Sequence, residues 1–459
     1  MVNSQSDIPP GGAVNPADKQ GRFSNNYFDG LPVRGIHKML FFLIMAAYFF
    51  EQFDNWNFGF IAPALAQSWG LKPTDIATIL FWYFIGMTSG GFLGGVVSDF
   101  IGRRKTFLAS IIIFSVSSII TGHTDNFIVF TIFRALTGFG VFCMMVTSQA
   151  YIAEMAPAES RGMWQGRVAA IGFCAVPVVA FICRLVIPMS EDAWRYIFYA
   201  GGLGLVTFAL GLKYLKESPR WLVAHGRIKE AEEITTFLTG KDIDLSEVAK
   251  LVPPKIAVSD VLIGMFTRKY IGRTLLLMLL FVCITPAGFL LTTWTTQLLK
   301  MLGFSVADSL TAMTIISIGV PAGCFLNSIV SDMGGRKLPL AILGVLAAVS
   351  SFIFGGMSSL MLLTLAGFMV TVFNMALNFT LFSYTAESYP TRMRNTATGF
   401  HNGLARLSVS ASQPLIPMIH AAYGFVGIFT SVAILFFLPV IPLLIWGKKT
   451  GGKSLEEIE

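Results

Sequence analysis

The chain of 459 residues carries too little charge to coat soluble domains. Charged residues make up 13% of the sequence, whereas hydrophobic residues make up 54% and Phe alone occurs 41 times. A soluble domain contains about 25% charged residues, so the apolar excess must face lipid. The net charge of +7 suggests a nucleic-acid partner at first sight, but the basic residues are placed as in a membrane protein.

The sequence also lacks the patterns of a metal centre or a catalytic site. Its five cysteines lie in apolar runs without metal-ligand spacing: Cys143, Cys174, Cys183, Cys283 and Cys324. We expect them to be buried small hydrophobic residues. Within the apolar segments there is no His-x-x-x-His pair, no Gly-x-Ser-x-Gly motif and no acidic metal cluster. The prediction is therefore no enzyme, no metal and no cofactor.

Long apolar runs recur at a length that fits a bilayer, for which a helix needs about 20 residues. Six lie near 38–66, 76–98, 106–122, 127–151, 163–187 and 194–214, and six more near 274–298, 308–330, 338–356, 360–385, 396–420 and 425–446. We predict an all-α membrane protein with twelve transmembrane helices. The predicted parts are a disordered cytosolic tail (1–36), an N-terminal six-helix bundle (37–214), a cytosolic loop with short helices (215–273), a C-terminal bundle (274–446) and a cytosolic tail (447–459).

The distribution of Lys and Arg predicts the orientation. Of the 33 such residues, 27 fall on the tails and even-numbered loops and four on the opposite side, while Arg134 and Arg406 lie within spans. The positive-inside rule then places both termini and the long loop in the cytosol. The basic character indicates the topology of an inner-membrane protein and no nucleic-acid partner.

Two loop motifs occur once in each half. The loop after span 2 contains Asp99-Phe-Ile-Gly102-Arg103-Arg104, and the loop after span 8 contains Asp332-Met-Gly-Gly335-Arg336. After spans 4 and 10 come Ala153-Glu154 through Arg161, and Ala386-Glu387 through Arg394. Such repetition indicates duplication of a six-helix unit, and hence two pseudo-symmetric halves.

These repeated motifs resemble the major facilitator superfamily, and the resemblance covers the chain after about residue 35. Arg134-Ala-Leu-Thr-Gly138-Phe-Gly140, Glu217-Ser-Pro-Arg220-Trp-Leu and Gly452-Lys-Ser-Leu-Glu-Glu457 are similar to sugar porters and their organic-anion and aromatic-acid relatives. Sugar porters usually carry paired glutamines and an Asn early in span 7. Here that region reads Phe281-Val-Cys-Ile-Thr285-Pro286-Ala-Gly-Phe289, which argues against a sugar.

The loop motifs predict the residues that control the conformational change, because an acid and a basic cluster can clamp neighbouring helix ends. They are Gly95, Asp99, Gly102, Arg103, Arg104, Glu154, Arg161, Glu217, Arg220, Asp332, Arg336, Glu387 and Arg394.

Two carboxylates lie inside span 1. Glu51 and Asp54 are three residues apart and share a helix face, and Glu51 lies about 21 Å beyond His37 at the helical rise. Both cannot ionise comfortably at low dielectric, so one is suited to carry a proton. The alternative is a local polar cluster with Asn55 and Asn57. In sugar porters an acid matching Asp54 pairs with an arginine matching Arg134, and the resemblance therefore implies Asp54–Arg134 as the proton-coupling pair.

Arg406 lies about 18 Å from the cytosolic face by the same rise. Its segment, Gly399-Phe-His-Asn402-Gly403-Leu-Ala-Arg406, resembles span 11 of aromatic-acid symporters and organic-anion transporters. A guanidinium is always charged and binds carboxylates in a bidentate manner, so an unpaired one at mid-membrane predicts an anionic substrate. The alternative is a structural pair with Glu51, which would leave room for a neutral substrate.

Other polar residues within spans are candidate substrate contacts or contacts between helices. They are Trp294, Gln297, Asn374, Asn378, Tyr384, His401 and Asn402.

The expected function is proton-coupled uptake of a small organic acid, aromatic or nicotinate-like, through alternating access in a monomer. The alternatives are a carrier for a neutral polyol, a sugar or an organic cation, or a drug exporter. Neither predicted tail is long enough to add a sensor domain.

Overall fold

The computed structural model describes residues 28, 33, 35–157, 159–240, 243–249, 258–331, 333 and 335–448, and in this part of the chain the regular elements are all helices. The predicted tails, 1–36 and 447–459, and the predicted gating residue Asp332 lie largely or wholly outside the described residues. The first helix begins at Gly35, two residues before the predicted start of the first bundle.

The first bundle contains six membrane-crossing segments. They are α1 (Gly35–Trp69), α2 (Pro73–Ile101), α3 (Arg103–His123), α4 (Phe127–Met155), α5 (Arg161–Val186), and the consecutive α6 (Trp194–Gly201) and α7 (Gly204–Tyr214). A short 3-10 turn, Ile187–Met189, extends α5. Because only Gly202 and Leu203 separate α6 from α7, the two short helices make one crossing.

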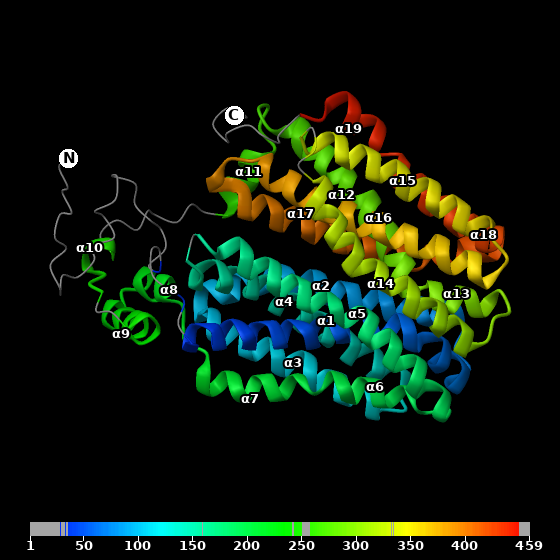
Figure 1. Cartoon of the computed structure of the whole chain (residues 1–459), viewed down its shortest axis with the longest axis horizontal. Coiled ribbons are helices and arrows are strands. Elements are labelled where there is room, and N and C mark those ends of the chain that lie inside the picture. Colours follow the sequence, from blue (N-terminus) through cyan, green and yellow to red (C-terminus); the bar gives the residue numbers. More distant parts are fainter. Residues whose placement is uncertain are drawn as a thin grey trace, which may run out of the picture.

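The described part of the connection between the bundles contains four short helices: α8 (Pro219–Ala224), α9 (Ile228–Thr239), α10 (Ser246–Ala249) and α11 (Val258–Met265). A small apolar core holds α8 and α9 together, built on Trp221, Leu222, Val223, Ala231, Ile243 and Leu245. These helices all lie at one end of the bundle (Figure 1), called here the linker end; the opposite end is the far end.

The second bundle contains the remaining crossings. Its helices are α12 (Ile271–Thr293), α13 (Thr295–Met301), α14 (Val306–Val330), α15 (Lys337–Gly356), α16 (Leu360–Glu387), α17 (Thr391–Ser412), α18 (Leu415–Phe437) and α19 (Val440–Trp446). Within α18 the backbone leaves the helical region at Gly424, where φ is 64° and ψ is −161°. The chain turns back there: α17 and the start of α18 make one crossing, and the rest of α18 with α19 makes the next (Figure 1).

Eleven segments of the described chain are long and apolar enough to span a membrane. The additional one is α17, whose sequence is polar on average because it carries Arg406, His401 and Asn402. The predicted all-helical fold with twelve crossings is confirmed. A polar crossing of this kind is tolerated because its polar side chains can face protein instead of lipid.

The packing of helices repeats between the bundles. The α2–α4 and α3–α4 contacts of the first correspond to the α14–α16 and α15–α16 contacts of the second, and α1–α5 corresponds to α12–α17. Between the bundles, α5 packs on α14 and α2 packs on α17. These two contacts are equivalent, because α2 of the first bundle corresponds to α14 of the second and α5 corresponds to α17. The two bundles form two layers, one with α1–α7 and one with α12–α19 (Figure 1).

The outer surface of both layers is apolar, as expected for helices that contact lipid. More than half of the surface of Phe100, Phe181, Phe325 and Phe352 is exposed. The prediction that all five cysteines are buried is wrong for Cys174, which is exposed, and for Cys324, which is half-buried. A thiol on a lipid-facing helix needs no burial in protein. An apolar sequence context therefore does not distinguish a cysteine buried in the protein from one that faces lipid.

Close packing of α2 on α4 depends on glycines one turn apart. A Cβ at Gly86 would lie 2.0 Å from the carbonyl oxygen of Ala135, and one at Gly90 would lie 2.2 Å from that of Phe139. Small residues let membrane helices approach closely where no hydrophobic force drives them together. The glycines therefore set the distance between the helix that carries Tyr83 and the helix that carries Arg134.

We expect Gly90→Ala to separate α2 from α4 and to lower the free energy of unfolding by about 1–3 kcal/mol, the usual effect of overpacking. Thermal unfolding of the purified protein in detergent measures the loss as a lower Tm. Gly166→Ala on α5 is the control, because a Cβ there meets no atom within 4 Å. An equal Tm for the two variants would contradict the packing role.

Candidate functional site

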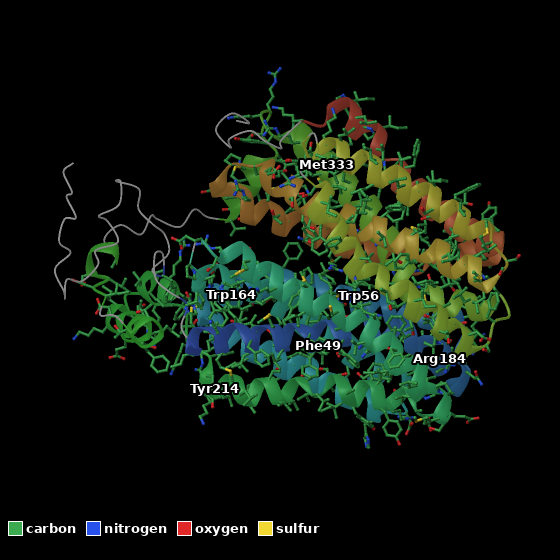
Figure 2. The ribbon with its side chains drawn as sticks, in the orientation of Figure 1. Phe49, Trp56, Trp164, Arg184, Tyr214 and Met333 are labelled. Atoms are coloured by element: carbon green, nitrogen blue, oxygen red, sulfur yellow. The ribbon has the colours of Figure 1, made fainter. Side chains whose placement is uncertain are left out.

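The two carboxylates of α1 lie in the interior of the protein. Glu51 and Asp54 are both fully buried, one helical turn apart in a helix whose middle third is surrounded by other helices. Figure 2 shows α1 crossing the first layer, with Phe49 and Trp56 near its mid-length. The helix persists through this polar stretch because its apolar residues outnumber the polar ones and the backbone bonds internally.

Asp54 is the centre of the first charged cluster. Its Oδ1 lies 3.7 Å from Nη1 of Arg134, which is also fully buried. The same oxygen accepts hydrogen bonds from Asn57 Nδ2 at 2.6 Å and from Ser118 Oγ at 2.9 Å. The structure thus brings Asp54 and Arg134 together, and it also places Asn57 beside them, as the alternative of a local polar cluster requires.

Aromatic rings complete the surroundings of Arg134. Its guanidinium carbon lies 4.5 Å from the ring centre of Tyr83 and 5.4 Å from those of Phe58 and Phe198. None of its three guanidinium nitrogens makes a hydrogen bond among the described residues. A buried cation held by ring faces and one carboxylate loses most of its stabilisation when that carboxylate is neutralised.

Arg406 is the centre of the second charged cluster. Its guanidinium carbon lies 4.5 Å from the ring centre of Phe289 on α12 and 4.8 Å from that of Phe142 on α4. Its Nε and Nη1 atoms are buried and make no hydrogen bond in the described part of the chain. The rings belong to opposite bundles, so Arg406 lies at the junction between the layers with donors available to a ligand.

Glu51 lies near Arg406 but does not form a close ion pair with it. The structure describes the charged atoms of both residues, and no nitrogen of Arg406 lies within 4.0 Å of a carboxylate oxygen of Glu51. Their charges still interact over a longer range. Glu51 Oε2 instead accepts a hydrogen bond from Gln52 at 3.0 Å, and the buried Oε1 has no hydrogen-bond partner in the described part of the chain. The structural pair considered from the sequence is therefore not closed in this conformation.

A continuous set of contacts joins Glu51 to the rings around Arg406. Trp56 Nε1 donates to Gln52 Oε1 at 2.8 Å, and the Trp56 ring stacks on Phe289 at 5.2 Å with an angle of 6°. Phe289 thus contacts a tryptophan of α1 on one side and the guanidinium of α17 on another. The carboxylate and the guanidinium flank one aromatic surface shared by both bundles.

The other candidate contacts are distributed over the second bundle. Asn378 Nδ2 bonds to Asn374 Oδ1 at 2.8 Å, and Asn374 packs against the backbone of Gly288, next to Phe289. Trp294 Nε1 donates to Gln413 Oε1 at 2.8 Å. The Oε1 atom of Gln297 is buried without a hydrogen bond among the described residues, and Asn402 is half-buried.

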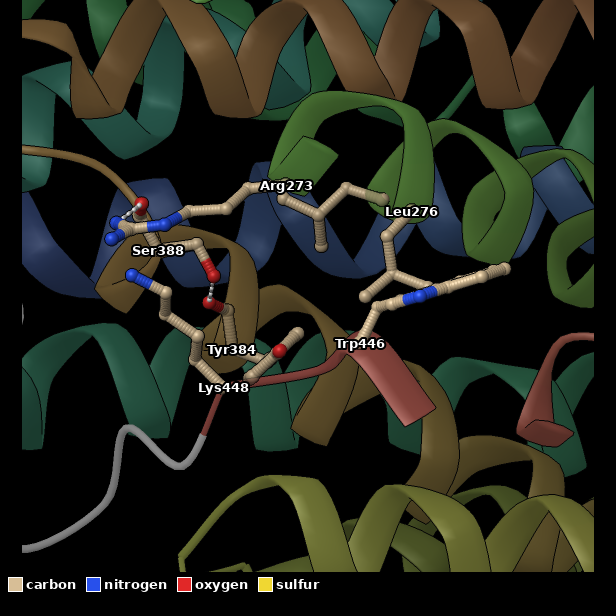
Figure 3. A pocket seen from close by; sticks show the side chains of 7 residues that line it. Arg273, Leu276, Tyr384, Ser388, Trp446 and Lys448 are labelled. Atoms are coloured by element: carbon tan, nitrogen blue, oxygen red, sulfur yellow. Dashed lines mark hydrogen bonds between the residues drawn. The ribbon is translucent and has the colours of Figure 1, made fainter. Parts of the chain in front are cut away.

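Two of the predicted substrate contacts lie elsewhere. The His401 ring is hydrogen-bonded to Tyr389 at 3.1 Å and stacks on Phe281. Tyr384 lines a small pocket with Arg273, Trp446 and Lys448 at the linker end (Figure 3). Both residues thus make contacts within the second bundle.

The predicted gating residues form ion pairs at the linker end. Arg103 contacts Asp99 at 2.5 Å and Glu154 at 2.9 Å, and the backbone N–H groups of Arg103 and Arg104 donate to Glu217 at 2.8 and 3.1 Å. Gly102 has φ of 108°, and a Cβ there would meet Glu217 Oε2 at 2.3 Å.

The second bundle repeats part of this network with the ion pair of Arg336 and Glu387 at 2.9 Å. For the other predicted gating residues that the structure describes, no ion pair is found: Gly95 is half-buried, Arg220 is exposed, and buried nitrogens of Arg161 and Arg394 make no hydrogen bond among the described residues.

The sequence did not reveal the aromatic half of the site. Phe142, Phe289 and Tyr83 line the two guanidinium groups, but they belong to a chain with 41 Phe and 11 Tyr. Ser118 and Gln52 were missed as well, and only their position opposite a buried charge distinguishes them. The described residues contain no group of three or more His, Cys, Asp or Glu side chains that could hold a metal ion.

Comparison with known proteins gives consistent matches over nearly the whole chain. A Bacillus subtilis protein with a provisional name as a metabolite transport protein is 29% identical, with 94% of this chain and 97% of that protein covered. The niacin transporter of Acinetobacter baylyi is 26% identical over 94% of this chain and 98% of its own length. The inward-open structure of the Escherichia coli xylose transporter superposes with a TM-score of 0.75 at 19% identity, covering 92% of this chain and 99% of that one.

The family model for the Major Facilitator Superfamily matches residues 44–414, which include Asp54, Arg134 and Arg406. That range covers most of the chain and both bundles. The chain therefore belongs to the Major Facilitator Superfamily and is a membrane transporter, not an enzyme.

Proposed function

We propose that the protein takes up a small aromatic carboxylate together with a proton, by alternating access, as a monomer in the cell inner membrane. The linker end faces the cytosol and the far end faces outward, as the distribution of Lys and Arg requires. Substrate enters from the far end and binds between the bundles. A neutral polyol, a sugar, a cation or an exported drug would be a different cargo for the same fold.

The surroundings of Arg406 carry this proposal. A guanidinium inside the membrane costs at least about 2.5–3.5 kcal/mol, and that cost is reduced when donors are paired. Here Nε and Nη1 of Arg406 are buried and have no hydrogen-bond partner among the described residues, and the rings of Phe289 and Phe142 beside the guanidinium offer no acceptor oxygen. A carboxylate can bind a guanidinium in a bidentate manner, and an attached aromatic ring can stack on Phe289 or Trp56.

The names of relatives include transporters of organic acids and of a sugar. The Acinetobacter baylyi relative is named a niacin transporter, and a Cupriavidus pinatubonensis relative, 24% identical over 429 residues, is provisionally named a 4-methylmuconolactone transporter. A Bacillus subtilis relative, 26% identical over 415 residues, is named an arabinose-proton symporter. We infer the anionic cargo from Arg406, for which a sugar provides no counter-charge.

The Asp54–Arg134 pair is the proposed proton switch. A carboxylate 3.7 Å from a guanidinium attracts it strongly in an apolar interior, and protonation removes this attraction. Asp54 is favoured over Glu51 because its ion pair ties α1 to α4. Releasing that tie frees α1, which also contacts the second bundle through Trp56 and Phe289.

In the proposed cycle, contacts at the far end have to open for uptake. Lys300 Nζ donates to the carbonyl oxygen of Pro63 at 3.1 Å and to Gln67 Oε1 at 3.2 Å, and Arg184 Nε donates to Thr311 Oγ1 at 2.6 Å. Each bond joins one bundle to the other. In the proposed cycle these bonds break in the outward-open state, while the ion pairs around Arg103 and Arg336 hold the linker ends of helices in place.

We expect Arg406→Gln to weaken carboxylate binding by about 30-fold or more, because losing one partner of a buried charge pair costs about 2–5 kcal/mol. Arg406→Lys keeps the charge but not the bidentate geometry, so it restores only part of the affinity. Binding is measured as the thermal shift of purified protein with nicotinate and benzoate, compared with their uncharged amides.

Arg167→Gln is the matched control, because Arg167 also lies over an aromatic ring, Trp164 at 5.1 Å, but is exposed. This variant should bind carboxylates like the wild type. Equal shifts for acid and amide in the wild type, or a normal carboxylate shift in Arg406→Gln, would show that the cargo is not held by its charge.

We expect Asp54→Asn to abolish proton-driven accumulation in proteoliposomes, because the amide mimics a permanently protonated acid. Exchange of labelled for unlabelled substrate should continue, since exchange needs no net proton movement. Accumulation is measured with an imposed pH gradient, with and without a protonophore.

Glu51→Gln is the comparison that separates the two carboxylates, and it should retain protonophore-sensitive accumulation. Loss of accumulation in Glu51→Gln with normal accumulation in Asp54→Asn would transfer the proton site to Glu51. Wild-type uptake that ignores the protonophore would refute proton coupling as a whole.

A further inference from the structure

A small pocket at the linker end of the second bundle has no role in the proposed transport cycle. It is lined by residues of α12, α16 and the end of the α19 crossing: Arg273, Leu276, Leu277, Tyr384, Ser388, Trp446 and Lys448. Figure 3 shows Arg273 and Lys448 reaching toward the Ser388 and Tyr384 side of the pocket, with Trp446 and Leu276 on the other side. The pocket is therefore cationic at one side and apolar at the other.

Several positive charges converge there. Arg273 Nη1 donates to the backbone oxygen of Ser388 at 3.1 Å, which fixes its guanidinium at the pocket. Burial, together with the nearby charges of Arg273 and Lys269, lowers the pKa of Lys448. Three cations that repel one another at a protein surface provide a favourable field for an anion.

The apolar side of the pocket continues onto the lipid-facing surface. Trp446 is 71% exposed and Ile445 is 64% exposed at the end of α19, and Leu275 of α12 is 54% exposed. A tryptophan that ends a membrane crossing, followed by a lysine, is typical of the level of the lipid headgroups. The cationic side then lies at headgroup depth and the apolar side at the depth of the upper acyl chains.

We propose that this pocket binds the phosphate of an anionic phospholipid from the cytosolic leaflet, with Arg273 and Lys448 facing the phosphate and the nearby charge of Lys269 adding to their attraction. The acyl chains of that lipid lie along Trp446, Ile445 and Leu275. This site is separate from the Arg406 cluster and depends on the membrane orientation, not on the identity of the transported substrate.

The size of the pocket favours a lipid over a soluble anion. Its volume is about 10 Å³, close to the space that one water molecule needs. Only the tip of a ligand, such as one or two phosphate oxygens, fits inside. The rest of the ligand must lie outside, where the adjoining surface is apolar, and a phospholipid provides acyl chains for that surface.

The test is lipid binding to the purified full-length chain in neutral detergent, counted by native mass spectrometry during titration with phosphatidylglycerol or phosphatidylcholine. We expect the wild type to prefer phosphatidylglycerol. A Lys or Arg near a charged membrane surface contributes about 1 kcal/mol, so Lys269→Gln and Lys448→Gln should each weaken phosphatidylglycerol binding about fivefold. Trp446→Ala should weaken binding of the same lipid without changing the charge.

Lys38→Gln is the matched control, since it removes an exposed lysine at the linker end of the other bundle and should leave the preference unchanged. Lys448→Arg should keep it. Glycerol phosphate, which carries the same phosphate without acyl chains, should not displace the bound lipid. Equal phosphatidylglycerol affinity in wild type and Lys269→Gln/Lys448→Gln would overturn the proposal, as would glycerol phosphate binding as tightly as the lipid.

Discussion

The structure depends on how charged side chains are accommodated in an apolar interior. Four of them, Glu51, Asp54, Arg134 and Arg406, lie among helices that otherwise contact lipid or one another. Each charge needs a counter-charge, a hydrogen bond or the face of an aromatic ring, because water is scarce there. The first bundle meets this requirement internally for Asp54 and Arg134. Arg406 is surrounded by rings from both bundles instead.

In the proposed cycle this difference separates a proton switch from a substrate-binding group. Arg134 has a counter-charge only while Asp54 is ionised, so one proton would change its state. Arg406 has no carboxylate within 4.0 Å among the described residues, so an arriving anion would change its state. The two arginines differ in counter-charge: Asp54 lies 3.7 Å from Arg134, whereas Arg406 has no such partner among the described residues, so only Arg134 would respond directly to a proton on Asp54.

Much of the fold could be predicted from the sequence because lipid imposes a simple rule. A crossing needs about 20 apolar residues, and the loop motifs around Asp99 and Arg336 repeat with the bundles. The charged residues of the site could be identified from the sequence for the same reason. Their aromatic neighbours did not, since Phe289 differs from the other phenylalanines only in its three-dimensional position. Tyr384 is a polar residue in a span, which made it a candidate substrate contact, and in the structure it lines the pocket at the linker end.

One helix links the two charged clusters, and this link makes coupling possible in the proposed cycle. Asp54 and Glu51 are one turn apart on α1, so Asp54 cannot shift toward or away from Arg134 without moving Glu51 and Gln52. Gln52 holds Trp56, and Trp56 stacks on the same Phe289 that faces Arg406. A proton at one end of this path and a carboxylate at the other therefore act on the same rigid element. Coupling requires that the proton and the carboxylate favour the same position of α1. One helical turn is too stiff for the two charged clusters to move independently of each other.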